Sequence, residues 1–166
     1  MNIVLIEPEI HWNTGNIGRT CIATGAVLHL VGKLGFSLEA KEVRRAGLDY
    51  WPKIRLKVHD DLDRFLVTLP DDPSLLFFST KGKKSYWDAP YDPDSYLIFG
   101  SETKGFAPDI HQRYSDNIYR IPMNKEVRSL NLSTAAGVVL FEALRQTGYE
   151  AGQGSKRSPC LAPDIN

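Results

Sequence analysis

Small polar side chains gather in residues 123–131, a short stretch that joins an expected strand end to a helix, and they include Asn124, Ser129 and Asn131. All three can donate and accept hydrogen bonds. The residues that follow repeat an apolar side chain at helical spacing, at Leu132, Ala135, Ala136, Val139, Leu140, Ala143 and Leu144. Asn131 or Ser133 can cap the free N–H groups at the start of this helix. Alone, the pattern indicates either a capped amphipathic helix or one wall of a polar site.

Two more polar loops follow expected strands, at Ser79–Gly82 and Gly100–Gly105. Ligands of open α/β sheets bind outside the carboxyl ends of the strands, so these loops and residues 123–131 are expected to form one site. Gly100 is expected to let backbone approach a ligand closely. A valine at position 100 should therefore abolish ligand binding and leave the fold intact.

Several common site types lack their sequence patterns. The chain contains neither the GxGxxG of a dinucleotide fold nor the GxxxxGK[ST] of a P-loop NTPase. The four histidines are scattered and form no Ser–His–Asp or Cys–His arrangement. Cys21 and Cys160 are far apart without metal-ligand spacing, which favours a reduced, cytoplasmic protein. The N-terminal apolar run is too short for a signal peptide, and no run is long enough for a membrane span.

The chain of 166 residues has no net charge, so any polyanion must bind to a local patch. Residues 41–57 hold six basic residues against two acidic ones, with Tyr50 and Trp51 among them. Such a segment can hold a phosphate backbone and stack bases. It is equally typical of a solvated face with two core aromatics, and the sequence leaves both interpretations open.

Strands and helices alternate along the chain, which predicts an α/β fold with a parallel sheet. The expected strands are Ile3–Ile6, Val27–Val31, Ile54–Val58, Leu75–Ser79, Tyr96–Phe99 and Asn117–Ile121. The expected helices follow a turn at Asn13–Asn16, span Asp60–Leu69, begin at Pro108 and begin at Leu132. Residues 1–149 are expected to form one domain, and the Gly-, Ser- and Pro-rich residues 150–166 a flexible tail.

Three segments resemble, in order, the three motifs of the SPOUT (SpoU–TrmD) RNA methyltransferases. They read NTGNIGRTC, LIFGSETKG and IPMNKEVRSLNLSTAAGVVLFEALRQ. The resemblance covers about residues 2–149. It is greatest to the small, single-domain TrmL group, whose pattern is also matched by Glu7–Ile10, Leu34–Phe36 and Arg44–Tyr50.

The resemblance implies a single-domain α/β fold with a C-terminal trefoil knot, acting as a cytoplasmic homodimer. It implies S-adenosylmethionine as methyl donor, with S-adenosylhomocysteine as product and no metal. The implied reaction is 2′-O-methylation of the wobble ribose, of cytidine or modified uridine, in the anticodon stem-loop of leucine tRNAs. The alternatives are another tRNA position or ribosomal RNA, and a protein of a different class, an RNA binder without activity.

The resemblance also assigns residues. The implied cofactor-binding residues are Phe78, Thr80, Gly100, Glu102, Ile121, Ser129 and Leu130. The implied catalytic residues are Arg19, Ser129 and Asn131, and the implied RNA-binding residues are Asn13, Asn16, Arg44 and Arg45. A guanidinium stays protonated near neutral pH, so Arg19 is expected to clamp a phosphate and fix the ribose, with transient base catalysis as the alternative.

Overall fold

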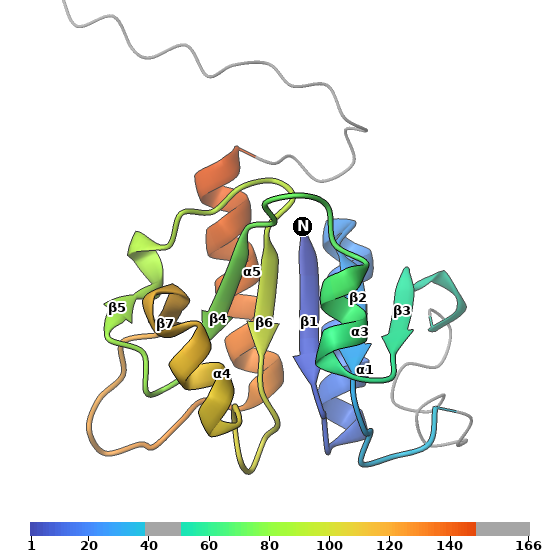
Figure 1. The fold of residues 1–166 in the computed structure, drawn as a ribbon, viewed down its shortest axis with the longest axis horizontal. Helices are drawn as coiled ribbons and strands as arrows, with labels where there is room; N and C mark the ends of the chain where they lie inside the picture. The colour runs from blue at the N-terminus through green and yellow to red at the C-terminus, as the bar shows by residue number, and fades with distance from the viewer. Residues whose placement is uncertain (39–50, 149–166) are drawn as a thin grey trace, which may run out of the picture.

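The computed structural model describes residues 1–38 and 51–148, which form one sheet with helices on both faces (Figure 1). The strands are β1 (Asn2–Ile6), β2 (Val27–Val31), β3 (Leu56–His59), β4 (Leu75–Phe78), β5 (Lys84–Ser85), β6 (Tyr96–Phe99) and β7 (Ile118–Arg120). The α-helices are α1 (His11–Thr24), α3 (Leu62–Val67), α4 (Pro108–Arg113) and α5 (Leu132–Thr147). Short 3-10 helices are η1 (Trp51–Lys53), η2 (Tyr86–Asp88) and η3 (Ser115–Asn117).

The seven strands lie in the order β3-β2-β1-β6-β4-β7-β5, and every pairing between them is parallel. The central strands β1, β6 and β4 are continuous apolar runs because both faces of the sheet are covered. The predicted parallel α/β fold is thereby confirmed. The order reverses between β1 and β6, which is where such sheets bind ligands.

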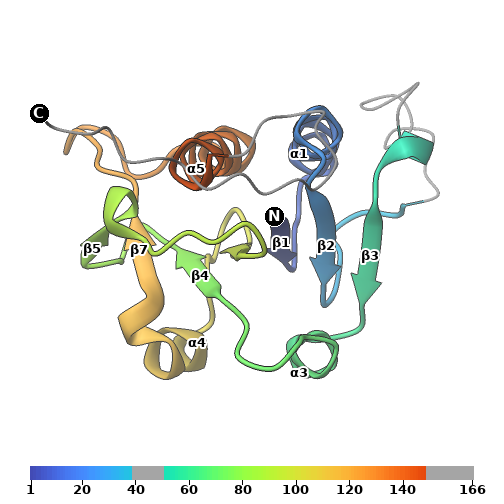
Figure 2. The same ribbon diagram turned by 90° about the horizontal axis from the view of Figure 1, so that it is seen from above.

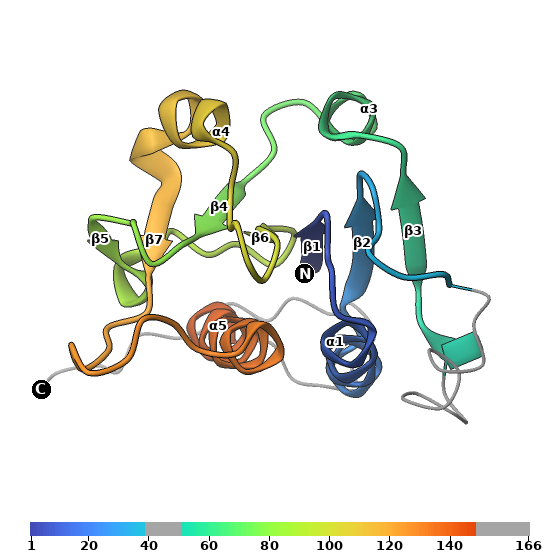
Figure 3. The ribbon, with the colours of Figure 1, turned by 90° about the horizontal axis from the view of Figure 1, so that it is seen from below.

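Helices α1 and α5 pack side by side on one face of the sheet, while α3 and α4 cover the other (Figures 2 and 3). Alternate residues of β1 divide between the two cores, because successive strand side chains point to opposite faces. Ile3 and Leu5 pack in the core beneath α1 and α5, and Val4 packs in the core on the α3 and α4 face. Helices α1 and α5 are thus held on the sheet by a buried apolar layer.

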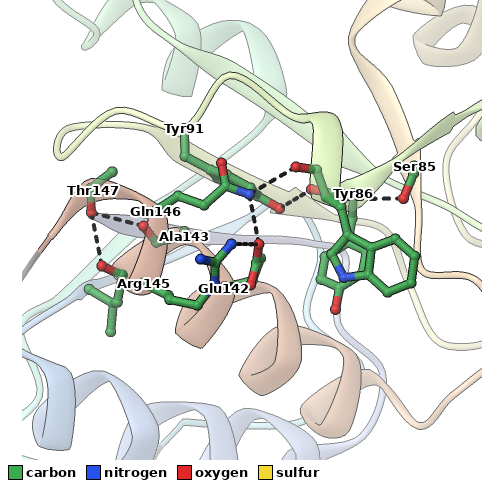
Figure 4. Close-up of polar contacts among 10 residues, drawn as sticks. Ser85, Tyr86, Tyr91, Glu142, Ala143, Arg145, Gln146 and Thr147 are labelled. Carbon is green, nitrogen blue, oxygen red and sulfur yellow. Dashed lines mark hydrogen bonds and ion pairs between the residues drawn. The ribbon is translucent and has the colours of Figure 1, made fainter. Parts of the chain in front are cut away.

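Helix α5 is anchored at both ends. Asn131 caps its first turn, and Gly148 ends it in a left-handed conformation. Near its C-terminus, the Gln146 amide donates to the Trp87 carbonyl at 2.8 Å and to Glu142 at 2.7 Å (Figure 4). Hydrogen bonds from Arg145 and then Gln146 lower the pKa of Glu142 to about 2. These contacts tie α5 to η2 and thereby to the edge of the sheet.

Three local expectations differ from the structure. Helix α1 begins at His11, so the turn expected at Asn13–Asn16 is helical. Strand β3 begins at Leu56 rather than Ile54, and the segment 83–94, in which the sequence indicates no regular element, contains β5 and η2. The predicted RNA-binding residues Arg44 and Arg45, like the predicted tail 150–166, lie outside the described residues.

Candidate functional site

A pocket of about 590 Å³ opens at the carboxyl ends of β4 and β6. Its walls come from the loops after β4, β6 and β7 and from the start of α1. Its size is within the range of small-molecule sites. All seven predicted cofactor-binding residues line it, namely Phe78, Thr80, Gly100, Glu102, Ile121, Ser129 and Leu130.

The apolar part of the pocket is suited to a flat ring. Phe78 and Phe99 are the last residues of β4 and β6, and their rings stack with centroids 5.3 Å apart. Ile121 and Leu130 line the same pocket from the segment after β7. Apolar side chains beside exposed backbone groups are what an adenine ring requires, since its edge forms hydrogen bonds and its faces do not.

The loop after β6 is a tight turn in which Ser101 and Gly105 exchange backbone hydrogen bonds of 3.2 and 2.9 Å. A Cβ atom added at Gly100 would lie 2.4 Å from the Gly105 carbonyl carbon. The glycine is therefore required by the close approach of the chain to itself. The expectation that a valine at Gly100 leaves the fold intact is wrong, because the turn itself would have to shift.

The Glu102 carboxylate joins this turn to the start of α1. It accepts hydrogen bonds from the backbone N–H groups of Glu9 at 2.8 Å and Ile10 at 3.3 Å, and from the Asn13 amide at 2.9 Å. A carboxylate at the N-terminal end of a helix is also favoured by the helix dipole. Glu102 is thus positioned to hold the pocket wall together.

A second carboxylate, from the segment before α1, accepts hydrogen bonds from the turn after β6. Glu9 accepts hydrogen bonds from the Thr103 backbone N–H at 3.1 Å and from the Thr103 hydroxyl at 2.8 Å. The two segments, 7–13 and 100–105, therefore each supply a carboxylate to the backbone of the other. We call them together the Glu102 wall.

Asn13 and Asn131 extend the network to α5. The Asn131 amide donates to the Asn13 side-chain oxygen at 2.9 Å. The Asn131 side-chain oxygen accepts from the backbone N–H of Ser133 at 2.9 Å and of Thr134 at 3.4 Å. One side chain thus caps α5 and connects it to α1, which places the starts of both helices beside the pocket.

The structure brings together some predicted site residues and separates others. Ser129 and Asn131 line the pocket, as predicted for catalytic residues. Asn13 also lines it but is only 4% exposed, and both ends of its amide are engaged, which leaves little surface for the predicted RNA contact. Arg19 and Asn16 are exposed on α1 and do not line the pocket of their own chain.

The pocket offers side-chain hydrogen-bonding groups and charged side chains, including Ser129, Asn131 and Lys81. Among residues 1–38 and 51–148, no three His, Cys, Asp or Glu side chains gather into a metal-binding group. His111 lines the pocket, and burial together with the nearby Lys81 lowers its pKa. No helix in the same part of the chain is long and apolar enough to cross a membrane.

The sequence did not single out Glu9 or Thr103, or the pocket-lining side chains of Lys81, Lys104 and Arg128. Glu9 and Thr103 lie 94 positions apart, so no local pattern links them. For the three cations, one signal was available in the sequence, since each lies within one of the three polar loops.

Known proteins are similar to this chain in sequence and in fold. A family model described as the SpoU rRNA Methylase family matches residues 1–141. A tRNA (cytidine(34)-2'-O)-methyltransferase from Burkholderia pseudomallei (strain 1106a) is 46% identical over 153 residues, covering 91% of this chain and 98% of that protein.

Solved structures agree with the sequence relatives. One, described as "Structural insights into the 2-OH methylation of C/U34 on tRNA", superimposes with a TM-score of 0.84 at 43% identity, covering 87% of this chain and 94% of the other. Another, an AdoMet-bound rRNA methyltransferase from Sinorhizobium meliloti, gives a TM-score of 0.76 at 26% identity, covering 87% of this chain and 56% of the other.

Proposed function

Because this chain belongs to the SpoU methylase family, we propose that it transfers a methyl group from S-adenosylmethionine to the ribose 2′-hydroxyl of nucleotide 34 in tRNA. The family resemblance seen in the three sequence motifs is confirmed by the family model and by the relatives. The observation that carries the proposal is the pocket itself, since the predicted cofactor residues from three separate loops all line it.

The pocket fits the proposed cofactor. Phe78, Ile121 and Leu130 would supply apolar contacts for adenine, and polar groups of the same loops would meet its edge. When bound, S-adenosylmethionine supplies a methyl group on a positively charged sulfur, the electrophile that a ribose hydroxyl can attack. Ser129 and Asn131 line the pocket and would help to orient the ribose there. Complete orientation of two reactants can supply on the order of 7 kcal/mol of the barrier.

Arg19 leads us to propose a homodimer. It is exposed and absent from the lining of its own pocket, so a catalytic Arg19 would have to serve the pocket of a second copy. Helices α1 and α5 also leave large apolar side chains exposed on the molecule, including Trp12 at 57% and Phe141 at 58%. Apolar surface of this kind is typical of an interface.

Two finer features belong to the same proposal. Restriction to leucine tRNAs, with cytidine or modified uridine at the wobble position, is proposed from the resemblance, and the enzyme would then act in the cytoplasm. The trefoil knot is likewise proposed from the resemblance to the SPOUT motifs alone. A traced experimental electron-density map would test the knot.

Methyl transfer from radiolabelled S-adenosylmethionine tests the reaction and the substrate. We expect label in leucine tRNAs with cytidine or uridine at nucleotide 34, and none in a matched stem-loop whose nucleotide 34 alone carries 2′-deoxyribose. Ribosomal RNA serves as the competing substrate. Label in ribosomal RNA but not in tRNA would replace the proposed substrate with the alternative one.

Mixed dimers test the role of Arg19. Arg19→Ala leaves the pocket intact, and Asn131→Ala leaves Arg19 intact, so each variant alone should be inactive. If Arg19 acts on the partner's pocket, mixing the two denatured chains and refolding them together should restore activity at one site of each mixed dimer. If mixed dimers verified by mass spectrometry show no restored activity, Arg19 does not act on the partner's pocket. It would then act on the pocket of its own chain or have no catalytic role.

A further inference from the structure

Three cationic side chains lie around the pocket, one from each of the loops after β4, β6 and β7. They are Lys81, Lys104 and Arg128, and all three residues are exposed. The corresponding loops are separate in sequence and meet only because parallel strands end at the same edge of the sheet. We call these three side chains the basic rim.

The basic rim has no partner within the described part of the chain. The ion pair found there joins Arg145 to Glu142, at the far end of α5, and involves none of the three. Lys81 and Lys104 form hydrogen bonds through their backbone N–H groups, to Ser79 and Ser101, which leaves their ammonium groups available.

The charge around the pocket is also unbalanced. Glu102 is the one carboxylate among the lining residues, and three hydrogen-bond donors already occupy it. Burial and then Lys81 lower the pKa of the neighbouring His111, which disfavours a further cation there. Three cations thus face one satisfied carboxylate, although the whole chain has 20 basic and 20 acidic residues. A concave site lined by one sign of charge attracts ligands of the other sign.

We propose that the basic rim binds the phosphates on either side of the nucleotide whose ribose enters the pocket. This inference rests on the proposed function, which supplies the RNA, and adds residues that position it. Phosphate contacts fix the position and register of a strand without reading its bases, so the rim is proposed to set the register of the RNA. The cofactor's single carboxylate is a poorer match, because three separated and exposed cations exceed what one anion can use.

The test measures salt dependence in variants that remove the charge and keep a polar side chain, Lys81→Gln, Lys104→Gln, Arg128→Gln and the triple variant. Arg64→Gln is the matched control, because Arg64 is an exposed cation on α3, at the opposite face of the sheet. The probe is a fluorescent anticodon stem-loop, titrated at several salt concentrations. Calorimetry with S-adenosylmethionine follows cofactor affinity in the same proteins.

Each rim substitution should reduce the slope of log K against log salt by about 0.7, the value for one phosphate contact on a single strand. Three lost contacts reduce the slope by about 2, which is about two log units of affinity over the decade between 1 M and 0.1 M salt. The triple variant should therefore bind the stem-loop on the order of 100-fold more weakly at about 0.1 M salt. The Arg64→Gln slope and the cofactor affinity of all variants should match those of the parent.

Two results with the variants would overturn the proposal. An unchanged slope in a folded triple variant would show that the rim makes no phosphate contact. A loss of cofactor affinity with an unchanged slope would assign the rim to the cofactor's carboxylate. Failure of the proposed substrate is distinguishable, because a parent protein that prefers a ribosomal RNA fragment would still give the rim effect on that fragment. A parent that binds no RNA at all would overturn both.

Discussion

The Glu102 wall and the loop 122–130 line the same pocket, but they are held in different ways. Five side-chain hydrogen bonds join the two segments of the Glu102 wall. Among the described residues, the loop 122–130 forms two internal hydrogen bonds, both of 3.3 Å. They run from the N–H groups of Glu126 and Val127 to Asn124. Val127 is 53% exposed in this loop, so packing does not replace the missing bonds.

This difference indicates a division of labour within the pocket. A wall with many satisfied hydrogen bonds keeps its geometry before any ligand arrives, which lowers the cost of ordering on binding. A loop with few bonds opens and closes at low free-energy cost and can adapt to a ligand. We therefore expect substitutions in the Glu102 wall to affect stability and activity together, and substitutions in the loop 122–130 to affect binding with little change in stability.

The largest effect should follow from Glu102→Ala. It leaves the N–H groups of Glu9 and Ile10 and the Asn13 amide without their acceptor, at a cost of roughly 2–3 kcal/mol in the free energy of unfolding. Displacement of the wall should lower methyl transfer by on the order of 100-fold. Chemical denaturation and single-turnover kinetics measure the two effects.

Two variants give the matched comparison for Glu102. Glu102→Gln keeps one acceptor oxygen and should give an intermediate loss. Glu126→Ala removes an exposed carboxylate from the loop 122–130 and should change stability by less than about 0.5 kcal/mol. Equal losses for Glu102→Ala and Glu126→Ala would remove the distinction between the two parts of the pocket.

The next effect concerns two glycines of the same turn. An alanine Cβ at Gly100 would lie 2.4 Å from the Gly105 backbone, so Gly100→Ala should cost about 1–3 kcal/mol in unfolding free energy. Gly105 has φ +65° and nothing within 4 Å of an added Cβ, so Gly105→Asn should cost less than about 1 kcal/mol. Thermal unfolding of the two variants tests whether close chain approach, rather than backbone conformation, fixes this wall. The reverse order would contradict it.

Much of this site was predictable because its signals are local. The apolar runs predicted all strands of the sheet except β5, which has only two residues. The polar residues after β4, β6 and β7 predicted one pocket, since parallel strands end at the same edge. The start of α1 was missed because Ile10, at the N-cap position, makes no side-chain cap. Its polar partner is Glu102, 92 positions away, and no spacing rule covers such a contact.

Asn131 joins the Glu102 wall to α5, and two variants at this position distinguish its role as a helix cap from a role in positioning the site. Asn131→Ala should cost about 1 kcal/mol through the lost cap. Asn131→Asp keeps the capping oxygen at the positive end of the helix but loses the donor to Asn13, so it should stay near parent stability. If the contact with Asn13 positions the site, both variants should lose turnover under saturating cofactor and tRNA. Parent-like turnover of Asn131→Asp would limit Asn131 to capping.

The smallest effect at neutral pH should come from the opposite face of the sheet, where acid acts on a histidine pair. His29 Nδ1 lies 3.1 Å from His59 Nε2, and burial first, then His59, lowers the pKa of His29 to about 4. The unfolded chain therefore takes up this proton first as the pH falls. Stability contributed by neutral His29 is complete well above about pH 6.5 and is lost as the pH falls toward about 4, with roughly 2 kcal/mol lost by pH 5. Between pH 7 and pH 5 the melting temperature should fall further for the parent than for His29→Gln. If His29→Gln loses as much as the parent, the acid sensitivity lies elsewhere, and the carboxylates of the Glu102 wall become the groups to test.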